Sequence, residues 1–460
     1  MTEIANLFPK KHWFWKIGHI LSSNGASLDE LEFRNQMLRP QPHKLRLSDF
    51  NMEVGASPEH ATGKKISLRL SHCSKSSGLR PGKSPPFQWS QVIPTHRREQ
   101  AVEGMLMGCA VADAISLSRD GLHPRISLKL FGRTPIHFQF QPGMGVTSQR
   151  THLMLMTIQA MLESKTDKEL FANSLRNRIA WYQRAFPWRH AKQHIAKVYQ
   201  RLFRKAGDDS MKTGFADDPL IRSVVLAVML QGNMNSSSRW FQKCIEVSHP
   251  DNLALHAGVL VGYAAQIAQI VDPVNFDSLE AIDRLRASTD ERTLSCMLNE
   301  MREFLSENRS VAYVARQFGW ADGIPTELFA TALMGIYAWL RHPTNYRNCI
   351  ERSVLLGGAC ADVAVLAGSL SGIHLGKDMI PKSWLQRLTM FPYSKHWQEL
   401  AIERVKDWPH GVEDIQRASG VPSLFLGQIV RNLSGTVFRT IHAMIRLPMQ
   451  LTQFSVRNRS

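Results

Sequence analysis

Apolar residues recur at steps of three and four positions over most of the chain between about residue 99 and residue 391. This spacing places apolar side chains on one face of an α-helix. The periodic segments are Met105–Ile115, Leu153–Leu162, Leu170–Phe186, Leu220–Leu230, Ala254–Ile270, Thr331–Leu340 and Val354–Leu370. Strand-like alternation is scarce, and Ile136–Phe140 is the best example. The pattern therefore predicts an all-α domain, which we expect to span residues 96–391.

The first 95 residues differ from this helical region. They carry few long apolar periodicities and include Pro40–Lys44 and Ser71–Pro86, which are rich in Pro, Ser, Lys and Gly. Such a composition does not bury enough apolar surface to order a chain. We therefore expect residues 1–95 to form a largely flexible basic extension.

Residues 392–460 are expected to form a basic C-terminal extension with an amphipathic helix. No Asp or Glu occurs from Ile415 to the last residue. One helical stripe collects the apolar residues Leu426, Val430, Leu433, Val437, Ile441 and Met444. Such a helix can lie on an anionic membrane surface, dock on a partner, or pack on the helical core.

Charge and cysteine usage narrow the classes of protein. The chain has 460 residues, with 56 Lys plus Arg against 39 Asp plus Glu, and a net charge of +17. This excess favours nucleic acid, a lipid surface or a phosphorylated ligand as partner, unless it is only a solvated basic surface. Six scattered cysteines without C-x-x-C spacing indicate a reduced, cytoplasmic protein. Neither a signal peptide nor a transmembrane helix is predicted.

Four segments are richer in Gly or polar residues than a plain helical core requires: Glu103–Ala114, Gly143–Thr151, Gly214–Ser223 and Leu355–Ala364. In the first, Asp113 sits within an apolar stretch, and a buried carboxylate needs a backbone donor or a cation as its partner. The second and third segments are loops that lead into a helix. In the fourth, small residues precede a helix.

In order and spacing, these segments resemble the ADP-ribosylglycohydrolase family over roughly residues 99–391. Val247–Asp251 resembles the family's Thr-His segment, and Gly319–Ile324 with Tyr337–Pro343 resembles the stretch ahead of its last motif. The resemblance implies an orthogonal all-α domain that binds ADP-ribose beside two Mg²⁺ ions. It also implies hydrolysis of the bond between ribose C1″ and a protein side chain or small acceptor.

The chain departs from the family where that chemistry sits. The family's first acidic motif, Ser/Thr-Asp-Asp-Thr, reads Thr-Ser-Gln-Arg here, and its last motif, Gly-Gly-Asp-Thr-Asp-Thr, reads Gly-Gly-Ala-Cys-Ala-Asp. The family metal positions thus hold Thr147, Ser148, Gln149, Ala359, Ala361 and Asp362. A carboxylate 4 Å from a unit charge contributes about 4 kcal/mol at an effective dielectric of 20. Losing four carboxylates therefore predicts a pseudoenzyme with no Mg²⁺ cofactor.

The carboxylates that could still perform catalysis are Asp113, Asp217, Asp218 and Asp362. Each also has a structural alternative. Asp113 could pack between helices, and Asp218 could cap a helix that begins at Pro219. Asp362 could pair with Arg150, so that an ion pair replaces the lost metal charge.

The candidate ligand-binding residues are Gly143, Gly145, Arg222, His249, Gly357 and Gly358. Arg222 could contact a phosphate or form a surface ion pair, and His249 could instead pack in the core. Cys360, at a helix N-terminus, could have a lowered thiol pKa.

Three functions from different classes remain open. The first is a pseudoenzyme that binds an ADP-ribose-like ligand or a protein partner. The second is a hydrolase that acts through relocated carboxylates. The third is a basic scaffold that associates with a membrane or a nucleic acid through its termini.

Overall fold

The computed structural model describes residues 95–141, 143–184, 219–230, 234–249 and 251–408, together with 426, 427, 429–431, 433–435 and 437. Residues 1–94 lie outside the described part of the chain. The expected flexible extension therefore stays a prediction.

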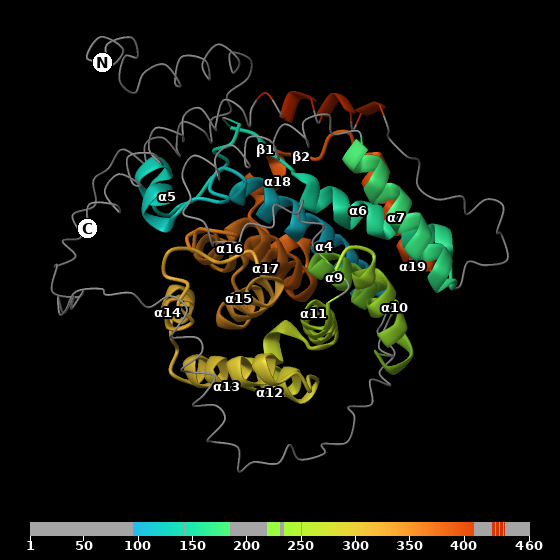
Figure 1. Ribbon diagram of the computed structural model, residues 1–460. Helices are drawn as coiled ribbons and strands as arrows, with labels where there is room; N and C mark the ends of the chain where they lie inside the picture. Colours follow the sequence, from blue (N-terminus) through green and yellow to red (C-terminus); the bar gives the residue numbers. More distant parts are fainter. Residues whose placement is uncertain are drawn as a thin grey trace, which may run out of the picture. The chain divides into compact units, whose positions relative to one another are not determined.

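The described residues are helical almost throughout, as the apolar periodicity predicts (Figure 1). The helices are α4 (Thr95–Ser116), α5 (Pro124–Phe131), α6 (Gln149–Ser164), α7 (Lys168–Arg184), α9 (Pro219–Leu230), α10 (Met234–Glu246), α11 (Asn252–Ile270), η3 (Pro273–Asn275), α12 (Ser278–Ala287), α13 (Arg292–Ser306), α14 (Val311–Gln317), α15 (Leu328–Arg341), α16 (Tyr346–Val354), α17 (Cys360–Leu375), η4 (Lys377–Met379), α18 (Lys382–Gln386) and α19 (Lys395–Asp407). Within the described ranges, the strands are β1 (Gly145–Val146) and β2 (Leu388–Thr389), which pair in parallel.

Two predicted elements are wrong. Ile136–Phe140 is not a strand, because the Ile136 amide donates to the Glu351 carboxylate (3.0 Å) rather than to a neighbouring strand. The expected helix over Val354–Leu370 is interrupted by a loop between α16 and α17. That loop holds Gly357 and Gly358, which both adopt positive φ angles (69° and 62°) that a helix does not contain.

The central contact of the fold is made by α4 and α17, which lie side by side (Figure 1). A Cβ atom added at Gly104 of α4 would lie 2.0 Å from the carbonyl oxygen of Gly372 of α17. One added at Gly108 would lie 2.2 Å from the carbonyl oxygen of Gly368. The glycines of both helices therefore let the two backbones touch, and any side chain at these positions would separate them.

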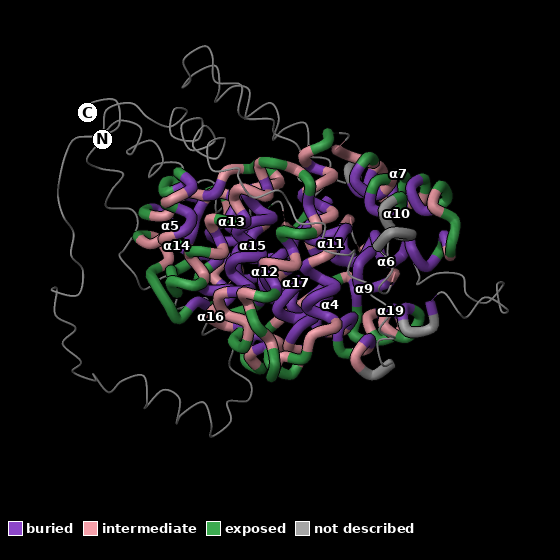
Figure 2. Tube along the Cα trace, turned by 90° about the horizontal axis from the view of Figure 1, so that it is seen from below, coloured by how far each residue is buried: buried purple, intermediate pink, exposed green. Residues whose placement is uncertain are grey.

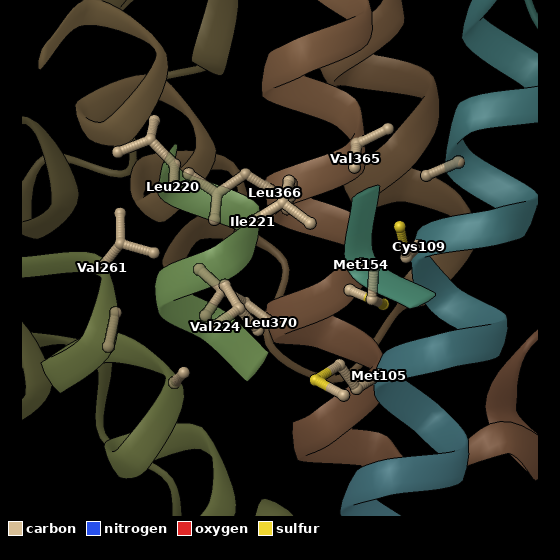
Figure 3. Packing of buried hydrophobic residues seen from close by; sticks show 14 of the residues in the cluster. Met105, Cys109, Met154, Leu220, Ile221, Val224, Val261, Val365, Leu366 and Leu370 are labelled. Carbon is tan, nitrogen blue, oxygen red and sulfur yellow. The ribbon is translucent and has the colours of Figure 1, made fainter. Parts of the chain in front are cut away.

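Other helices bury their apolar faces around this pair (Figure 2). Figure 3 shows this packing where Cys109 of α4, Met154 of α6, Val224 of α9 and Leu366 of α17 approach one another. Burying one such aliphatic side chain stabilises a fold by about 1.5–3 kcal/mol. The core therefore holds the N-terminal ends of α6 and α17 in fixed positions beside the C-terminal end of α4.

Helix α11 is long and apolar enough to cross a membrane, judged by length and composition alone. It lies in the core instead, where it packs against α9, α15 and α17, and 67% of its most apolar window is buried. The core helix of a globular protein passes the same test, so this helix is weak support for a membrane span.

The helical domain extends beyond the expected boundary at residue 391. Helix α19 packs on α4 and α6, and Trp397, Ala401 and Val405 join the same apolar core. The Trp408 indole donates to the carbonyl oxygen of Met161 (3.1 Å), which fixes the end of α19 against α6.

Four cysteines of the described residues, Cys109, Cys244, Cys349 and Cys360, are buried with free thiols. The expectation of reduced cysteines is confirmed at these four positions, and Cys73 lies outside the described residues.

Candidate functional site

The two altered acidic motifs meet where three helix ends converge. The first turn of α6 carries Arg150, the first turn of α17 carries Asp362, and the loop after α4 carries Asp120. We call these three residues the Arg150 cluster. The fold brings them together because α4 packs against both α6 and α17.

A bridging guanidinium defines the geometry of the Arg150 cluster. Arg150 Nε donates to Asp362 Oδ1, and Arg150 Nη2 donates to Asp120 Oδ2 at 3.0 Å. The side chains of Arg150, Asp362 and Asp120 are only 11%, 17% and 29% exposed. The predicted ion pair between Arg150 and Asp362 is confirmed, and Asp120 is a second carboxylate partner.

Burial and charge act in opposite directions on these groups. Burial alone would lower the pKa of Arg150, but Asp120 and Asp362 outweigh it and raise that pKa well above its ordinary value. Burial raises the pKa of the Asp362 carboxyl, and Arg150 opposes this shift. The guanidinium therefore stays protonated and cannot act as a base.

Asp113 has a structural role in this site. Its carboxylate accepts hydrogen bonds from the amide and hydroxyl of Ser148, both at 2.6 Å. It also accepts from the hydroxyl of Thr151 at 2.7 Å and from its amide at 3.3 Å. Asp113 is fully buried, and its four donors belong to the start of α6. It thus fixes the helix that presents Arg150, and its lone pairs are used for that purpose.

The residues at the family's metal positions do not fit a pair of Mg²⁺ ions. Ala359 and Ala361 are buried and offer no ligand, and Ser148 is held by Asp113. Thr147 Oγ1 is buried and has no hydrogen-bond partner in the described part of the chain. Thr147 and Gln149 therefore offer neutral oxygens only, and the Asp362 carboxylate is engaged by Arg150. Across the described ranges, no group of three or more His, Cys, Asp or Glu is placed to hold a metal ion. The positive charge beside Asp120 and Asp362 is the guanidinium of Arg150.

Three of the four glycines expected to bind ligand, Gly145, Gly357 and Gly358, make close backbone contacts. The Gly358 amide donates to Leu122 O and the Ile324 amide donates to Gly357 O, at 2.8 and 3.0 Å. The Gly145 amide donates to Arg387 O at 2.8 Å, whereas a Cβ at Gly143 would meet no atom within 4 Å. Their roles in ligand binding stay predictions.

Arg222 and His249 meet at Ser248. Arg222 Nη2 donates to Ser248 Oγ, and Ser248 Oγ lies 2.9 Å from His249 Nδ1. Arg222 is fully buried in α9, so the alternative of a surface ion pair is wrong. His249 is half-buried. Phosphate recognition by this trio stays a prediction.

Three further sequence expectations concern the helix starts. Asp217 and Asp218 lie outside the described residues, although α9 does begin at Pro219. Cys360 is buried, and burial raises the pKa of its thiol, so the expected lowering is wrong.

The sequence analysis did not identify Asp120 as a partner of Arg150. An acidic residue before a glycine at a helix end is common, so the sequence carried no signal for this contact.

The helical fold, with polar segments meeting at the ends of α4, α6 and α17, defines an all-α class of protein. The ADP-ribosylglycohydrolase family model matches residues 94–412, and the chain belongs to this family.

Two individual proteins are similar to this chain at low sequence identity. ADP-ribosylhydrolase ARH3 of Gallus gallus is 26% identical over 175 residues, which cover 32% of this chain and 46% of that protein. The chain thus spans about half the length of this curated relative. A solved structure titled ADP-ribosylglycohydrolase-related protein complex is 17% identical, with a TM-score of 0.45, and the match covers 70% of this chain and 99% of that one.

Proposed function

We propose that this chain is a pseudoenzyme of the ADP-ribosylglycohydrolase family, which binds an ADP-ribose-like ligand or a protein partner without Mg²⁺. The observation that carries this proposal is the bridge from Arg150 to Asp120 and Asp362. A protonated guanidinium balances the carboxylates in the place where the family's motifs bring metal ligands.

The chemistry of the Arg150 cluster supports loss of hydrolysis. In two-metal hydrolysis, the cations lower the pKa of a bound water and orient it for attack. A guanidinium is a hydrogen-bond donor with no vacant coordination position, so it cannot generate a hydroxide in this way.

The competing function is hydrolysis through relocated carboxylates. Such a carboxylate would need a free lone pair facing the substrate. Asp113 is engaged by Ser148 and Thr151, and Asp362 is engaged by Arg150. These contacts favour the pseudoenzyme over the relocated site.

Calorimetric titration of ADP-ribose, once with Mg²⁺ and once with a chelator, tests the proposal together with a hydrolysis assay on an ADP-ribosylated peptide. We expect equal affinity in both buffers and no release of ADP-ribose. Hydrolysis that requires Mg²⁺ would contradict the proposal. If ADP-ribose binds in neither buffer, the ligand-binding half of the proposal fails, and only loss of activity stands.

We also propose a cytoplasmic location, which the four buried free thiols support. Fractionation of cells that express the full chain tests it. Recovery of the chain outside the cytoplasmic and membrane fractions would contradict it.

A further inference from the structure

An exposed apolar stripe runs along the described part of the C-terminal segment. The described residues from 426 to 437 are helical. Leu426, Val430, Leu433 and Val437 are 75%, 57%, 46% and 59% exposed. Their four-three-four spacing places them on one face of the helix, which we call the C-terminal stripe. These four side chains therefore do not pack on the helical core, whereas Ile441 and Met444 of the predicted stripe lie outside the described residues.

An adjoining face of the same helix contacts the rest of the domain. A Cβ added at Gly427 would lie 2.4 Å from Pro392 Cβ, so the helix backbone touches the segment that follows β2. Arg431 is buried, and its Nη1 donates to the Tyr182 hydroxyl of α7 at 3.4 Å. Figure 1 draws this helical segment in red beside the β1–β2 pair. These contacts explain why the C-terminal stripe points outward.

A neighbouring loop also exposes an apolar side chain. Phe391, directly before Pro392, is 50% exposed. Pro392 contacts Gly427, which follows Leu426 at the start of the C-terminal stripe. Contiguous exposed apolar surface marks an interaction site in a folded protein, whereas single exposed apolar residues do not.

The positive charge of the chain favours an anionic partner for the C-terminal stripe. The last 46 residues contain six arginines and no acidic residue, and the whole chain carries a net charge of +17. The arginines are Arg417, Arg431, Arg439, Arg446, Arg457 and Arg459. Two copies of so basic a chain repel each other, whereas an anionic lipid surface attracts it.

We infer that the C-terminal stripe is a docking surface for an anionic lipid bilayer. The stripe lies in the plane of the membrane surface, with its apolar side chains among the lipid headgroups and upper acyl chains. The basic residues of the chain add electrostatic attraction to anionic headgroups. This inference is independent of the proposed function, because it uses no residue of the Arg150 cluster.

Co-sedimentation of the full chain with lipid vesicles tests the inference. We expect binding to vesicles that contain phosphatidylserine, little binding to pure phosphatidylcholine, and weaker binding at high salt. The double variant Leu426→Gln and Leu433→Gln should lower the partition coefficient about tenfold, since it removes apolar surface and no charge. Val274→Gln, at an 87% exposed residue of η3, is the matched control and should bind as the unsubstituted chain does.

Several outcomes would overturn the inference. Equal binding by the double variant would mean that charge alone holds the chain on vesicles. Binding to duplex DNA but not to vesicles would exclude a lipid surface. A dimer by light scattering that becomes a monomer in the double variant would mean that a second copy covers the stripe. Equal melting temperatures of the variants would show that each result reports docking rather than unfolding.

Discussion

Arg150 in the first turn of α6 donates to Asp362 in the first turn of α17, and so joins the two segments whose acidic residues are lost. The two residues lie 212 positions apart in the sequence. Asp120 adds a second carboxylate on the same guanidinium. The contact places the cation at the start of α6 against the carboxylate at the start of α17.

Arg150→Met should destabilise the fold by about 3–5 kcal/mol, because it leaves two partly buried carboxylates without their cation. Urea denaturation measures this. The control is Arg302→Met, which removes an exposed pair with Asp283 (2.7 Å) and should cost at most about 1 kcal/mol. Similar effects of the two variants would mean that the Arg150 cluster is solvated.

Arg150 should block the recovery of metal binding. We expect no Mg²⁺ binding when four acids are restored and Arg150 is kept, and binding when Arg150→Thr is added. The restoring substitutions are Ser148→Asp, Gln149→Asp, Ala359→Asp and Ala361→Asp. A unit charge 4 Å from a divalent ion costs about 8 kcal/mol at an effective dielectric of 20.

Isothermal titration with Mg²⁺ separates the outcomes of this experiment. Mg²⁺ binding by the variant that keeps Arg150 would contradict the prediction that Arg150 prevents metal binding. If the folded fivefold variant does not bind Mg²⁺ either, the site has diverged beyond its ligands.

Asp113→Asn should cost about 3 kcal/mol, because an amide group cannot accept all four hydrogen bonds at the start of α6 and leaves buried donors unsatisfied. Hydrogen exchange should become faster at the amides of Ser148 and Thr151. Asp251→Asn is the control: Asp251 caps α11, and asparagine caps a helix equally well. If Asp251→Asn lowered the stability and Asp113→Asn did not, the anchoring role of Asp113 would be refuted.

Gly108→Ala should destabilise by about 3 kcal/mol or more, because its Cβ would overlap the carbonyl oxygen of Gly368 and push α4 away from α17. Gly435→Ala is the counterpart. Its Cβ meets no atom within 4 Å, so the substitution should stabilise the helix by up to about 1 kcal/mol. Thermal unfolding of both variants tests the pair, and a neutral Gly108→Ala would show that the two backbones do not touch.

Stability should fall as the pH drops from 6.5 toward 4. Burial lowers the pKa of His374 from 6.5 to about 4, so the folded protein keeps this ring neutral while the unfolded chain protonates it. Stability is therefore full above pH 6.5, and about 3 kcal/mol is lost by pH 4. His374→Gln should flatten this dependence, as measured by urea titrations at both ends of the range.

A second histidine acts in the same direction. Burial also lowers the pKa of His342 to about 4. The double variant with His342→Gln should therefore depend on pH less than His374→Gln alone. An unchanged slope in both variants would mean that other groups set the acid sensitivity.

The sequence by itself determined the helical class, because the apolar period of three and four is a local property of each helix. It also determined that Ser148, Gln149, Ala359 and Ala361 offer no carboxylate, since residue identity alone decides whether a carboxylate is present. The Arg150–Asp362 pair was predictable from the resemblance, which pairs the two segments that carry these residues.

Only the tertiary structure decided which residues contact Arg150 and Asp113, and which way the C-terminal stripe faces. Asp120 joins Arg150 because the end of α4 packs beside α17, and no sequence spacing encodes that contact. Asp113 is an anchor because its four donors come from α6. The C-terminal stripe faces outward because Gly427 and Arg431, on an adjoining face, are held against Pro392 and Tyr182. A periodic pattern defines an apolar face but not its direction, which depends on what the rest of the chain packs against it.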